Sequence, residues 1–600
     1  MHRKKKRGLF FAIILWGIFS TVLASEDAPA DLEKIVVSRS RNYFSDEYTL
    51  NPADLANLPY SSPVEALAVL PIDLQSRSPH AAIQTDYSLR GSNFQDVLIL
   101  LNGQRINDPQ TAHFNSDIPI TRADIAGLEV LPSASSSLFG PDAIGGAVNF
   151  VIQKPEEEKY ILALSGGEHN TFSELFSVSQ KIKALGLRLS VENQQSSGFR
   201  EDTDFRKFTA SAVASLALPL GSFDLSWGYQ KKDFGAFDFY TPGKGYPSRE
   251  WTRTYLLDTG LHLEKDGLLI KPNFIWRRHF DKFVLDKTLQ RSDFISHHRN
   301  DTYTPNIYFQ KDIAKLGKLG FGLEYGQERI TSTTLGRHNR DHKSLFIDDS
   351  LNLAPKVSSD LSFRMDDFDG FNEVYTGSAN LRYEFIPQNY LRLAVSRNMR
   401  VPSFTELYYG DDGFTIGNPN LSAEKSLNYE IGYELKKESF SFSPTIFFRR
   451  EDDFIDWVWA DASQRWQAQN ISGADVLGIE TQFGWELNKI ASVNTNYTYI
   501  NKFTDKSGYL LKYGPNYSRH LWNTEFIFKL PFGSQSIGFT YKQKPGRSGW
   551  FLLNARGNFN LNKNMAIFVS GTNLLNVGYQ EIEGIPQPGR WIDSGIKLEW

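Results

Sequence analysis

The feature that most constrains this chain is an alternation of apolar and polar residues that recurs throughout residues 159–600. Leu391, Leu393 and Val395, for example, alternate with polar or small residues, and side chains two apart lie on the same face of a β-strand. This periodicity alone leaves open a soluble β-sandwich and a membrane β-barrel. The region is too long for one sandwich, and it shows no propeller repeat. We therefore expect many antiparallel strands that close into a barrel.

The hydropathy of the chain agrees with this expectation. Of the 600 residues, 40% are hydrophobic, and the mean hydropathy is −0.38. After the N-terminal segment no apolar run reaches the roughly 20 residues that a membrane-spanning helix needs, which excludes a helical membrane protein. The strands of a barrel alternate lipid-facing and lumen-facing residues, so each has only moderate hydropathy. The aromatic share of 14% is typical of barrels whose aromatic residues mark both membrane interfaces.

Residues 1–24 predict a signal peptide. Five basic residues at 3–7 precede an apolar run from Leu9 to Leu23, and Val22-Leu23-Ala24 provides a small-x-small step. We expect cleavage after Ala24 or one residue later, at Ser25. The alternative is an uncleaved anchor, but the apolar run is shorter than a bilayer requires. The chain contains no Cys, which excludes a disulfide-stapled secreted scaffold, and its formal net charge of −4 does not indicate a nucleic-acid partner.

Two further regions separate the signal peptide from the alternating segment. Residues 25–44 are polar, apart from an apolar island at 35–37, and they predict a flexible tether. Residues 45–155 read as a compact α/β domain with a short helix at Pro63–Leu70. The continuous apolar run Val97–Leu101 predicts a strand buried on both faces, and the Asn102-Gly103 pair after it predicts a type I′ hairpin turn. This domain should have a core of its own.

The last residues raise the question of what covers an apolar strand face at the very end of the chain. Asp593 is followed by Gly595, and Leu598 and Trp600 stand three and five residues beyond that glycine. The pattern is similar to the C-terminal signal by which the outer-membrane assembly machinery recognises the last strand of a barrel. With the signal peptide and the alternating region, it predicts that this face meets lipid.

Several motifs, in order, resemble those of the TonB-dependent outer-membrane receptors, which include cobalamin and siderophore transporters. In the compact domain they are Ser-Leu-Arg-Gly at 88–91, the strand and hairpin at 97–105, Ile-Ala-Gly-Leu-Glu-Val-Leu at 125–131 and the glycine-rich segment at 137–149. In the barrel they are Met-Arg-Val-Pro at 399–402, Glu-Leu-Tyr at 406–408, Gly-Asn-Pro-Asn-Leu at 417–421 with Glu-Lys-Ser at 424–426, Gly-Thr-Asn-Leu-Leu-Asn at 571–576 and Pro-Gly-Arg at 588–590.

The resemblance implies an all-β membrane protein. Residues 159–600 would form a transmembrane barrel of about 22 antiparallel strands in the Gram-negative outer membrane, and residues 45–155 would form a plug in its lumen. The implied function is active uptake of a scarce, large nutrient, either a cobalamin-type corrinoid or a ferric siderophore, with a slight preference for the corrinoid. The alternative is a passive plugged channel or structural barrel without energy coupling. A barrel enzyme would need a nucleophile and a base, and the sequence shows no such pair.

The outer membrane has neither ATP nor an ion gradient, so active uptake needs energy from a partner. The segment Glu33, Lys34, Ile35, Val36, Val37, Ser38 resembles the TonB box of the family. A short β-prone island in a polar tether is suited to add an edge strand to a periplasmic partner, here the TonB protein. The alternative is an ordinary apolar stretch in a linker.

In this family, plug arginines pair with barrel glutamates and hold the plug in place. Arg90 matches one such arginine, and Glu406 and Glu430 are the candidate acids. The chain departs from the family at Leu131-Pro132-Ser133, where relatives commonly carry Arg-Gly-Pro. We therefore expect a weaker lock between plug and barrel.

Substrate contacts should come from the plug apex and the extracellular loops. The polar, turn-rich segment 107–117 is the best apical loop, and Ser78-Pro79-His80 is the second. The candidate substrate-binding residues are His80, Asp108, Gln110, His113, Asn115, Tyr240, Trp251, Tyr408 and Tyr409. For each of them the alternative is a solvated loop residue or an aromatic residue at the membrane interface.

No cofactor is expected, and the metal content is left open. Glu201, Asp202 and Asp204 are candidates for a loop calcium ion, although such ions need six or more oxygen ligands. The histidine pairs at 297–298 and 338/342 do not by themselves make a metal site. Haem receptors usually place a histidine between the two barrel motifs, and residues 402–418 contain none, but His113 could still ligate iron from the plug.

Overall fold

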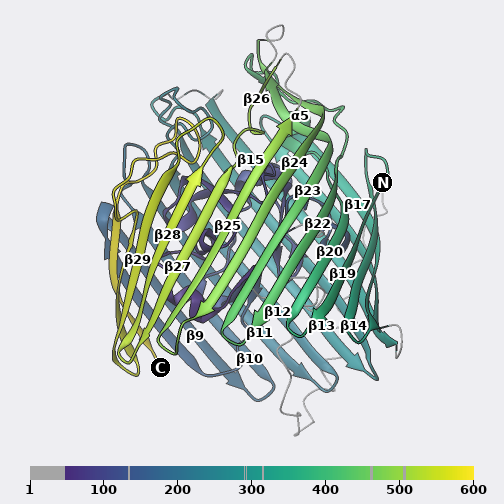
Figure 1. Ribbon diagram of the computed structural model, residues 1–600. Coiled ribbons are helices and arrows are strands. Elements are labelled where there is room, and N and C mark those ends of the chain that lie inside the picture. Colours follow the sequence, from purple (N-terminus) through teal and green to yellow (C-terminus); the bar gives the residue numbers. More distant parts are fainter. Residues whose placement is uncertain are drawn as a thin grey trace, which may run out of the picture.

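A computed structural model describes residues 48–132, 136–289, 291, 294–313, 317–459, 464–504 and 509–600. The predicted signal peptide and the predicted TonB box lie outside the described residues. Figure 1 shows the described chain as a tilted-strand barrel with the N-terminal part, in purple, inside it. Among the described residues, no helix is long and apolar enough to span a membrane.

The plug is built on a mixed five-stranded sheet with the strand order β1-β6-β7-β4-β5. β4 runs parallel to β7, and the other neighbouring strands are antiparallel. The plug strands are β1 (Thr49–Leu50), β2 (Asp73–Ser78), β3 (Gln84–Ser88), β4 (Val97–Leu101), β5 (Gln104–Arg105), β6 (Ile125–Pro132) and β7 (Gly146–Ile152). β2 and β3 form a separate hairpin. The short helices are α2 (Pro52–Asn57), α3 (Pro63–Ala66) and α4 (Ser136–Phe139), and the 3-10 turns are η3 (Leu67–Val69), η4 (His80–Ala82), η5 (Phe94–Asp96), η6 (Ala112–Phe114) and η7 (Arg122–Asp124).

The local predictions for the plug are confirmed where the structure describes them. α3 begins at Pro63 after the Ser62 cap, and η3 continues it to Val69, so the helix at 63–70 exists but tightens in its second half. β4 is 0% exposed along its whole length. Asn102 and Gly103 have φ values of 51° and 78°, as a type I′ turn requires.

The described part of the barrel contains 22 long antiparallel strands, and neighbours in sequence are neighbours in the barrel. They are β8 (Lys159–Gly167), β9 (Thr171–Ile182), β10 (Leu185–Ser196), β11 (Phe205–Leu218), β12 (Gly221–Gly235), β13 (Arg249–Lys265), β14 (Leu268–Val284), β15 (Ile295–Ile313), β16 (Gly317–Ser332), β17 (Gly336–Ala354), β18 (Val357–Phe368), β19 (Val374–Ile386), β20 (Asn389–Arg400), β22 (Glu424–Lys437), β23 (Phe440–Trp459), β24 (Trp466–Glu486), β25 (Ala491–Thr504), β27 (His520–Leu530), β28 (Gly533–Gln543), β29 (Trp550–Asn562), β30 (Met565–Thr572) and β31 (Trp591–Glu599). The two-residue strands β21 (Thr415–Ile416) and β26 (Leu510–Leu511), the turn η8 (Glu168–Asn170) and the helix α5 (Phe404–Tyr408) lie in the connections.

The C-terminal strand closes the barrel by pairing with β8. The last residue continues this pairing, because Trp600 and Tyr160 exchange two backbone hydrogen bonds of 2.7 and 3.1 Å, and their rings stack at 5.8 Å. Trp600 is 54% exposed. The terminal motif is therefore the closing strand, and its aromatic side chain is on the outer face, as predicted.

The two ends of the barrel differ in the length of their connections. The turns at the end that carries the C-terminus are short, for instance residues 355–356 and 387–388, whereas the other end carries loops such as 401–423 with α5 (Figure 1). Outer-membrane barrels have short periplasmic turns and long extracellular loops, so α5 lies at the extracellular end.

The alternation of apolar and polar residues along each strand decides which side chains face lipid and which face the lumen. Leu393 and Val395 on β20 are 41% and 43% exposed on the outer face, whereas Ser396, Asn398 and Arg400 are 2% exposed or less. The main apolar core is formed by the plug and takes in only Val213, Leu256 and Ile275 from the barrel. A smaller apolar cluster joins Ala81 and Ile83 of the plug to Phe205 and Phe234 of the barrel. Ion pairs and hydrogen bonds make the other contacts between plug and barrel that are described below.

Candidate functional site: the plug apex and the plug-barrel interface

Arg90 holds the plug against one side of the barrel wall. It follows β3 in a left-handed conformation with φ 50°, and Gly91 continues the turn with φ 73°. The turn is so close to β25 that a Cβ on Gly91 would lie 2.9 Å from the Ile500 side chain. The guanidinium group of Arg90 is 3.0 Å from Glu430 and 3.1 Å from Glu480.

This ion-pair cluster is enclosed. The Arg90 side chain is 2% exposed and the Glu480 side chain 1%. The guanidinium carbon lies 4.5 Å from the centre of the Phe447 ring. Burial would lower the pKa of Arg90, but Glu430, Glu480 and the nearby Tyr48 raise it above its ordinary value, so the group stays charged.

Glu480 was not predicted from the sequence. It lies on the lumen face of β24, while its neighbour Ile479 is 45% exposed on the outer face. The alternation of inward and outward side chains along β24 assigns Glu480 to the lumen. Many strand residues share that property, however, and no sequence motif distinguishes Glu480 from them. It also accepts a 2.6 Å hydrogen bond from the hydroxyl of Tyr48, the first residue that the structure describes.

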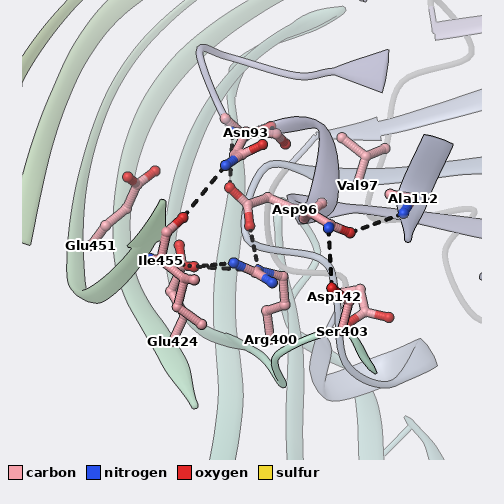
Figure 2. A network of polar contacts seen from close by, with 12 residues as sticks. Asn93, Asp96, Val97, Ala112, Asp142, Arg400, Ser403, Glu424, Glu451 and Ile455 are labelled. Atoms are coloured by element: carbon pink, nitrogen blue, oxygen red, sulfur yellow. Dashed lines mark hydrogen bonds and ion pairs between the residues drawn. The ribbon is translucent and has the colours of Figure 1, made fainter. Parts of the chain in front are cut away.

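The structure places Glu406 away from Arg90, and this corrects its expected role. Glu406 caps the start of α5 together with Ser403, and it pairs with Arg400 at 2.9 Å. The same Arg400 reaches Asp96 of the plug at 2.9 Å and Glu424 at 2.9 Å (Figure 2). In this second cluster the cation belongs to the barrel, and Asp96 is the one of its three carboxylate partners that the plug supplies. Burial, opposed by Arg400, raises the pKa of Asp96 to about 6.

Further barrel cations bind backbone carbonyls of the same plug segment. Arg449 donates to the carbonyl of Arg90 at 3.1 Å, and Lys502 donates to that of Gly91 at 3.4 Å. Figure 2 shows the neighbouring contact, in which Asn93 donates to the carbonyl of Ile455, at 3.5 Å. Plug residues from Arg90 to Asp96 are thus held along their length by β20 and by β22 to β25.

The predicted departure from the family at 131–133 falls at the end of β6, where Pro132 pairs with Gly146; residue 133 lies outside the described residues.

At the extracellular end of the plug, His113 is held by a carboxylate. Its Nδ1 is 2.9 and 3.0 Å from the two oxygens of Asp86, and Asp86 also pairs with Arg77 at 2.6 Å. Burial would raise the pKa of Asp86, but Arg77 and His113 bring it down to about 2. Burial lowers the pKa of His113, against the opposing effect of Asp86, so the imidazole is neutral near pH 7.

Aromatic rings surround the same imidazole. Phe94 stacks on it at 4.3 Å with an interplanar angle of 4°. Tyr240, in the loop after β12, is 5.5 Å away, and Tyr513, in the loop before β27, is 6.2 Å away. Of the predicted substrate residues, the structure therefore brings His113 and Tyr240 together. Asp86, Arg77, Phe94 and Tyr513 were missed, because their proximity depends on how loops far apart in the sequence meet.

Three other candidates of the apical loop use their side chains within the protein. Asp108 pairs with Arg277 of the barrel at 2.5 Å and is fully buried. The Gln110 side chain accepts from Asn300 at 2.8 Å. The Asn115 side chain accepts from the backbone of Asp108 at 2.9 Å. Asp108 and Gln110 fix the loop against the barrel wall, and Asn115 bonds within the loop, so none of the three side chains opens toward a ligand. A buried polar group must be paired, and here the partners are within the protein.

The remaining candidates lie elsewhere. His80 stacks on Trp591 at 4.4 Å, and burial, with Lys207 and His169, lowers its pKa to about 3. Glu250, the neighbour of Trp251 on β13, is buried and faces the lumen. Successive side chains of a strand point to opposite faces, so Trp251 belongs to the outer surface and not to the ligand path.

Tyr408, the last residue of α5, and Tyr409, which follows it, also pack within the extracellular loops. Tyr408 stacks on His338 at 3.6 Å, and Tyr409 meets the Trp457 ring edge-on at 6.2 Å. In the part of the chain that the structure describes, the rings next to His113 are those of Phe94, Tyr240 and Tyr513, and not those of Tyr408 and Tyr409. They line the loop structure above the barrel rather than the imidazole cluster.

The carboxylates considered for calcium face cations instead of a shared centre. Asp202 pairs with Lys287, Asp204 is 3.1 Å from Arg249, and Glu201 is exposed. Among the described residues, no group of three or more His, Asp or Glu side chains is arranged to hold a metal ion. The two histidines of the pair 338/342 have different partners: His338 bonds the carbonyl of Leu335 at 2.6 Å, and His342 lies 3.5 Å from Glu324.

A plug held by ion pairs inside a 22-stranded barrel defines the class of plugged outer-membrane receptors. Family models agree: the TonB-dependent receptor-like β-barrel matches residues 186–574, and the TonB-dependent receptor plug domain matches residues 42–147. The chain belongs to the TonB-dependent receptor family. The predicted resemblance, barrel and outer-membrane location are thereby confirmed, and the family consists of transporters and not enzymes.

The chain is similar to several known members. It is 23% identical over 505 residues to the vitamin B12 transporter BtuB of Photobacterium profundum, covering 80% of each chain. It is 22% identical over 558 residues to the iron-regulated outer membrane virulence protein of Vibrio cholerae, covering 85% of this chain and 84% of the other. The siderophore receptor PirA of Acinetobacter baumannii superimposes with a TM-score of 0.76 at 15% identity, covering 92% of this chain and 98% of the other.

Proposed function

We propose that this receptor imports a scarce, large nutrient across the outer membrane with energy supplied through TonB. The observation that carries the proposal is the nature of the plug-barrel contact. Ion pairs such as Arg90 with Glu430 and Glu480 hold the plug, whereas the apolar core of the plug scarcely extends into the barrel. Short-range polar contacts are lost after a small displacement, so a plug held in this way is suited to release under force and to return afterwards.

The proposed path of force begins at residues 33–38. This segment precedes Tyr48 by only ten residues, and Tyr48 is bonded to the same Glu480 that binds Arg90. A periplasmic partner that adds a strand to the segment would therefore pull on the Arg90 cluster almost directly.

The proposed cargo is a cobalamin-type corrinoid or a ferric siderophore, with the corrinoid preferred. The support is the similarity to a vitamin B12 transporter over 80% of the chain, beside fold similarity to siderophore receptors. The aromatic groups around His113 suit a large planar cargo, since ring faces stack on one another.

Deletion of residues 33–38 tests energy coupling. The deletion should abolish accumulation of labelled cobalamin or of a ferric siderophore in cells while leaving the affinity of the purified receptor unchanged. A matched control deletes residues 26–31, which shortens the same tether by the same length. Unchanged accumulation in the 33–38 deletion would favour the alternative, a passive plugged channel.

A further inference from the structure

The turn that joins β2 to β3 carries two alanines in a backbone conformation that alanine disfavours. Ala81 has φ 58° and ψ 14°, and Ala82, next in the chain, has φ 48°. In this left-handed region the Cβ of an L-residue crowds the backbone, and of the common residues only Gly avoids the cost. Two adjacent alanines of this kind persist only if the surrounding structure holds them in place.

Two lysines of the barrel wall hold this turn by its carbonyl groups. Lys207 on β11 donates to the carbonyl of Ala81 at 2.8 Å. Lys232 on β12 donates to the carbonyls of Ala82 and Ile83 at 3.3 and 2.8 Å. Lys207 is 9% exposed and Lys232 is fully buried. Hydrogen bonds from a charged donor are about twice as strong as those between neutral groups, so these bonds oppose any relaxation of the turn.

Apolar contacts enclose the same turn. Ala81 and Ile83 are 0% and 1% exposed, and they pack in one cluster with side chains of β11, β12 and the loop after β12. His80 stacks on Trp591, the first residue of β31, at 4.4 Å. Because the wall surrounds the turn in this way, its backbone can relax only after the turn has left the wall.

The other end of the same hairpin is held by a different part of the wall. Asp73, the first residue of β2, pairs with Lys542 on β28 at 3.1 Å. Arg90, two residues beyond β3, pairs with Glu430 on β22 and Glu480 on β24. In the order of the 22 long strands, β22 and β24 lie about half-way round the barrel from β11 and β12. The β2–β3 hairpin is therefore a strut across the lumen, with the strained turn at one end and the ion pairs at the other.

We infer that the turn at Ala81 and Ala82 stores conformational strain in the docked plug and gives it back when the plug leaves the wall. Lys207 and Lys232 can hold the turn only while it is docked, so the strain is present in the docked state and absent after release. The strain thus opposes the ion pairs of Arg90 and lowers the work that detaches the hairpin. This inference goes beyond the proposed function, because it depends neither on the cargo nor on the partner that pulls.

Replacement of both alanines by Gly tests the stored strain. Ala81→Gly with Ala82→Gly removes the strain, so the plug should be held more tightly, although Gly usually destabilises a folded chain. Full-length receptors in a lipid bilayer, pulled from the N-terminus, should rupture at a higher force than wild type. The rate of plug detachment should fall by about tenfold.

A matched control removes the same methyl group from an ordinary backbone. Ala66, at the end of α3, is a plug alanine that is 3% exposed, and its φ is −61°. Ala66→Gly should lower the rupture force, because Gly relieves no strain there and adds freedom to the unfolded chain. Opposite signs for the double variant and for Ala66→Gly separate strain from the loss of a buried methyl group.

The part played by the lysines is tested by exposure of the turn. The chain contains no Cys, so Ala81→Cys introduces a single thiol at a fully buried position. A hydrophilic maleimide should label it slowly in the intact receptor, and at least tenfold faster when Lys207→Met and Lys232→Met are added. Lys231→Met is the control, because Lys231 is an exposed lysine of the same strand β12. Heat-modifiable gel mobility confirms that each variant has a folded barrel.

The inference is wrong if the double Gly variant ruptures at the wild-type force or below it, or if loss of the two lysines leaves the labelling rate unchanged. Failure of the proposed function looks different: the 33–38 deletion would then still accumulate nutrient, whatever the rupture forces show.

Discussion

Replacing Arg90 by Ala is the sharpest perturbation of the plug lock. The substitution removes the cation that lies 3.0 Å from Glu430 and 3.1 Å from Glu480, and it leaves Glu480 buried at 1% exposure without its ionic partner. Breaking a buried ion pair by removing one partner costs about 3–5 kcal/mol. At about 1.4 kcal/mol per factor of ten, the plug should dissociate from the barrel wall at least a hundredfold more readily.

Two measurements follow the lock directly. Pulling on the N-terminus of single receptors in a lipid bilayer should show a lower rupture force for Arg90→Ala, and cells should become sensitive to large antibiotics that the intact plug excludes. Adding Glu480→Gln should recover part of the loss, because it removes the orphaned charge. Arg206→Ala, on the exposed face of β11, is the control and should change neither reading. If rupture force and antibiotic sensitivity are the same in Arg90→Ala and wild type, Arg90 does not lock the plug.

Three further substitutions test other parts of the reasoning. Tyr48→Phe removes the 2.6 Å hydrogen bond to Glu480, and a hydrogen bond to a charged acceptor contributes about 1.5–3 kcal/mol. The first rupture force in the same pulling experiment should therefore fall. An unchanged first rupture force would exclude Tyr48 from the force path. The pKa of His80 is about 3 in the folded plug and 6.5 in the unfolded chain, so the unfolded chain binds the proton first and the free energy of plug unfolding should fall as the pH drops from about 6.5 toward 3. Urea titrations at several pH values should show a weaker pH dependence for His80→Gln than for wild type. The same dependence in both proteins would refute the assignment to His80. Trp251→Ala should lower the thermal stability of the barrel without changing ligand affinity, and a large loss of affinity would return Trp251 to the ligand path.

Prediction from sequence worked where the physical cause is local. The Asn102-Gly103 turn, the buried run Val97–Leu101 and the outward parity of Trp600 each follow from a few consecutive residues. The first depends on backbone conformations that glycine and asparagine tolerate, and the other two depend on the two-residue period of a strand.

Prediction was weaker where partners come from distant segments. Glu430 was expected beside Arg90 and lies there. Glu406 pairs with Arg400 instead, and Glu480 was not predicted from the sequence. Each of these acids has the right charge, so charge alone could not choose among them. The choice depends on which side of the barrel each turn of the plug approaches.

The sequence by itself determined that residues 159–600 form a lipid-facing barrel closed by the terminal strand and that a small domain precedes it, because periodicity and turn chemistry act over a few residues. Only the tertiary structure decided which carboxylates hold Arg90, and that Asp86 pairs with both His113 and Arg77. The reason is that ion pairs and ligand geometry depend on distances of a few ångströms between residues hundreds of positions apart, which the closure of the barrel around the plug sets.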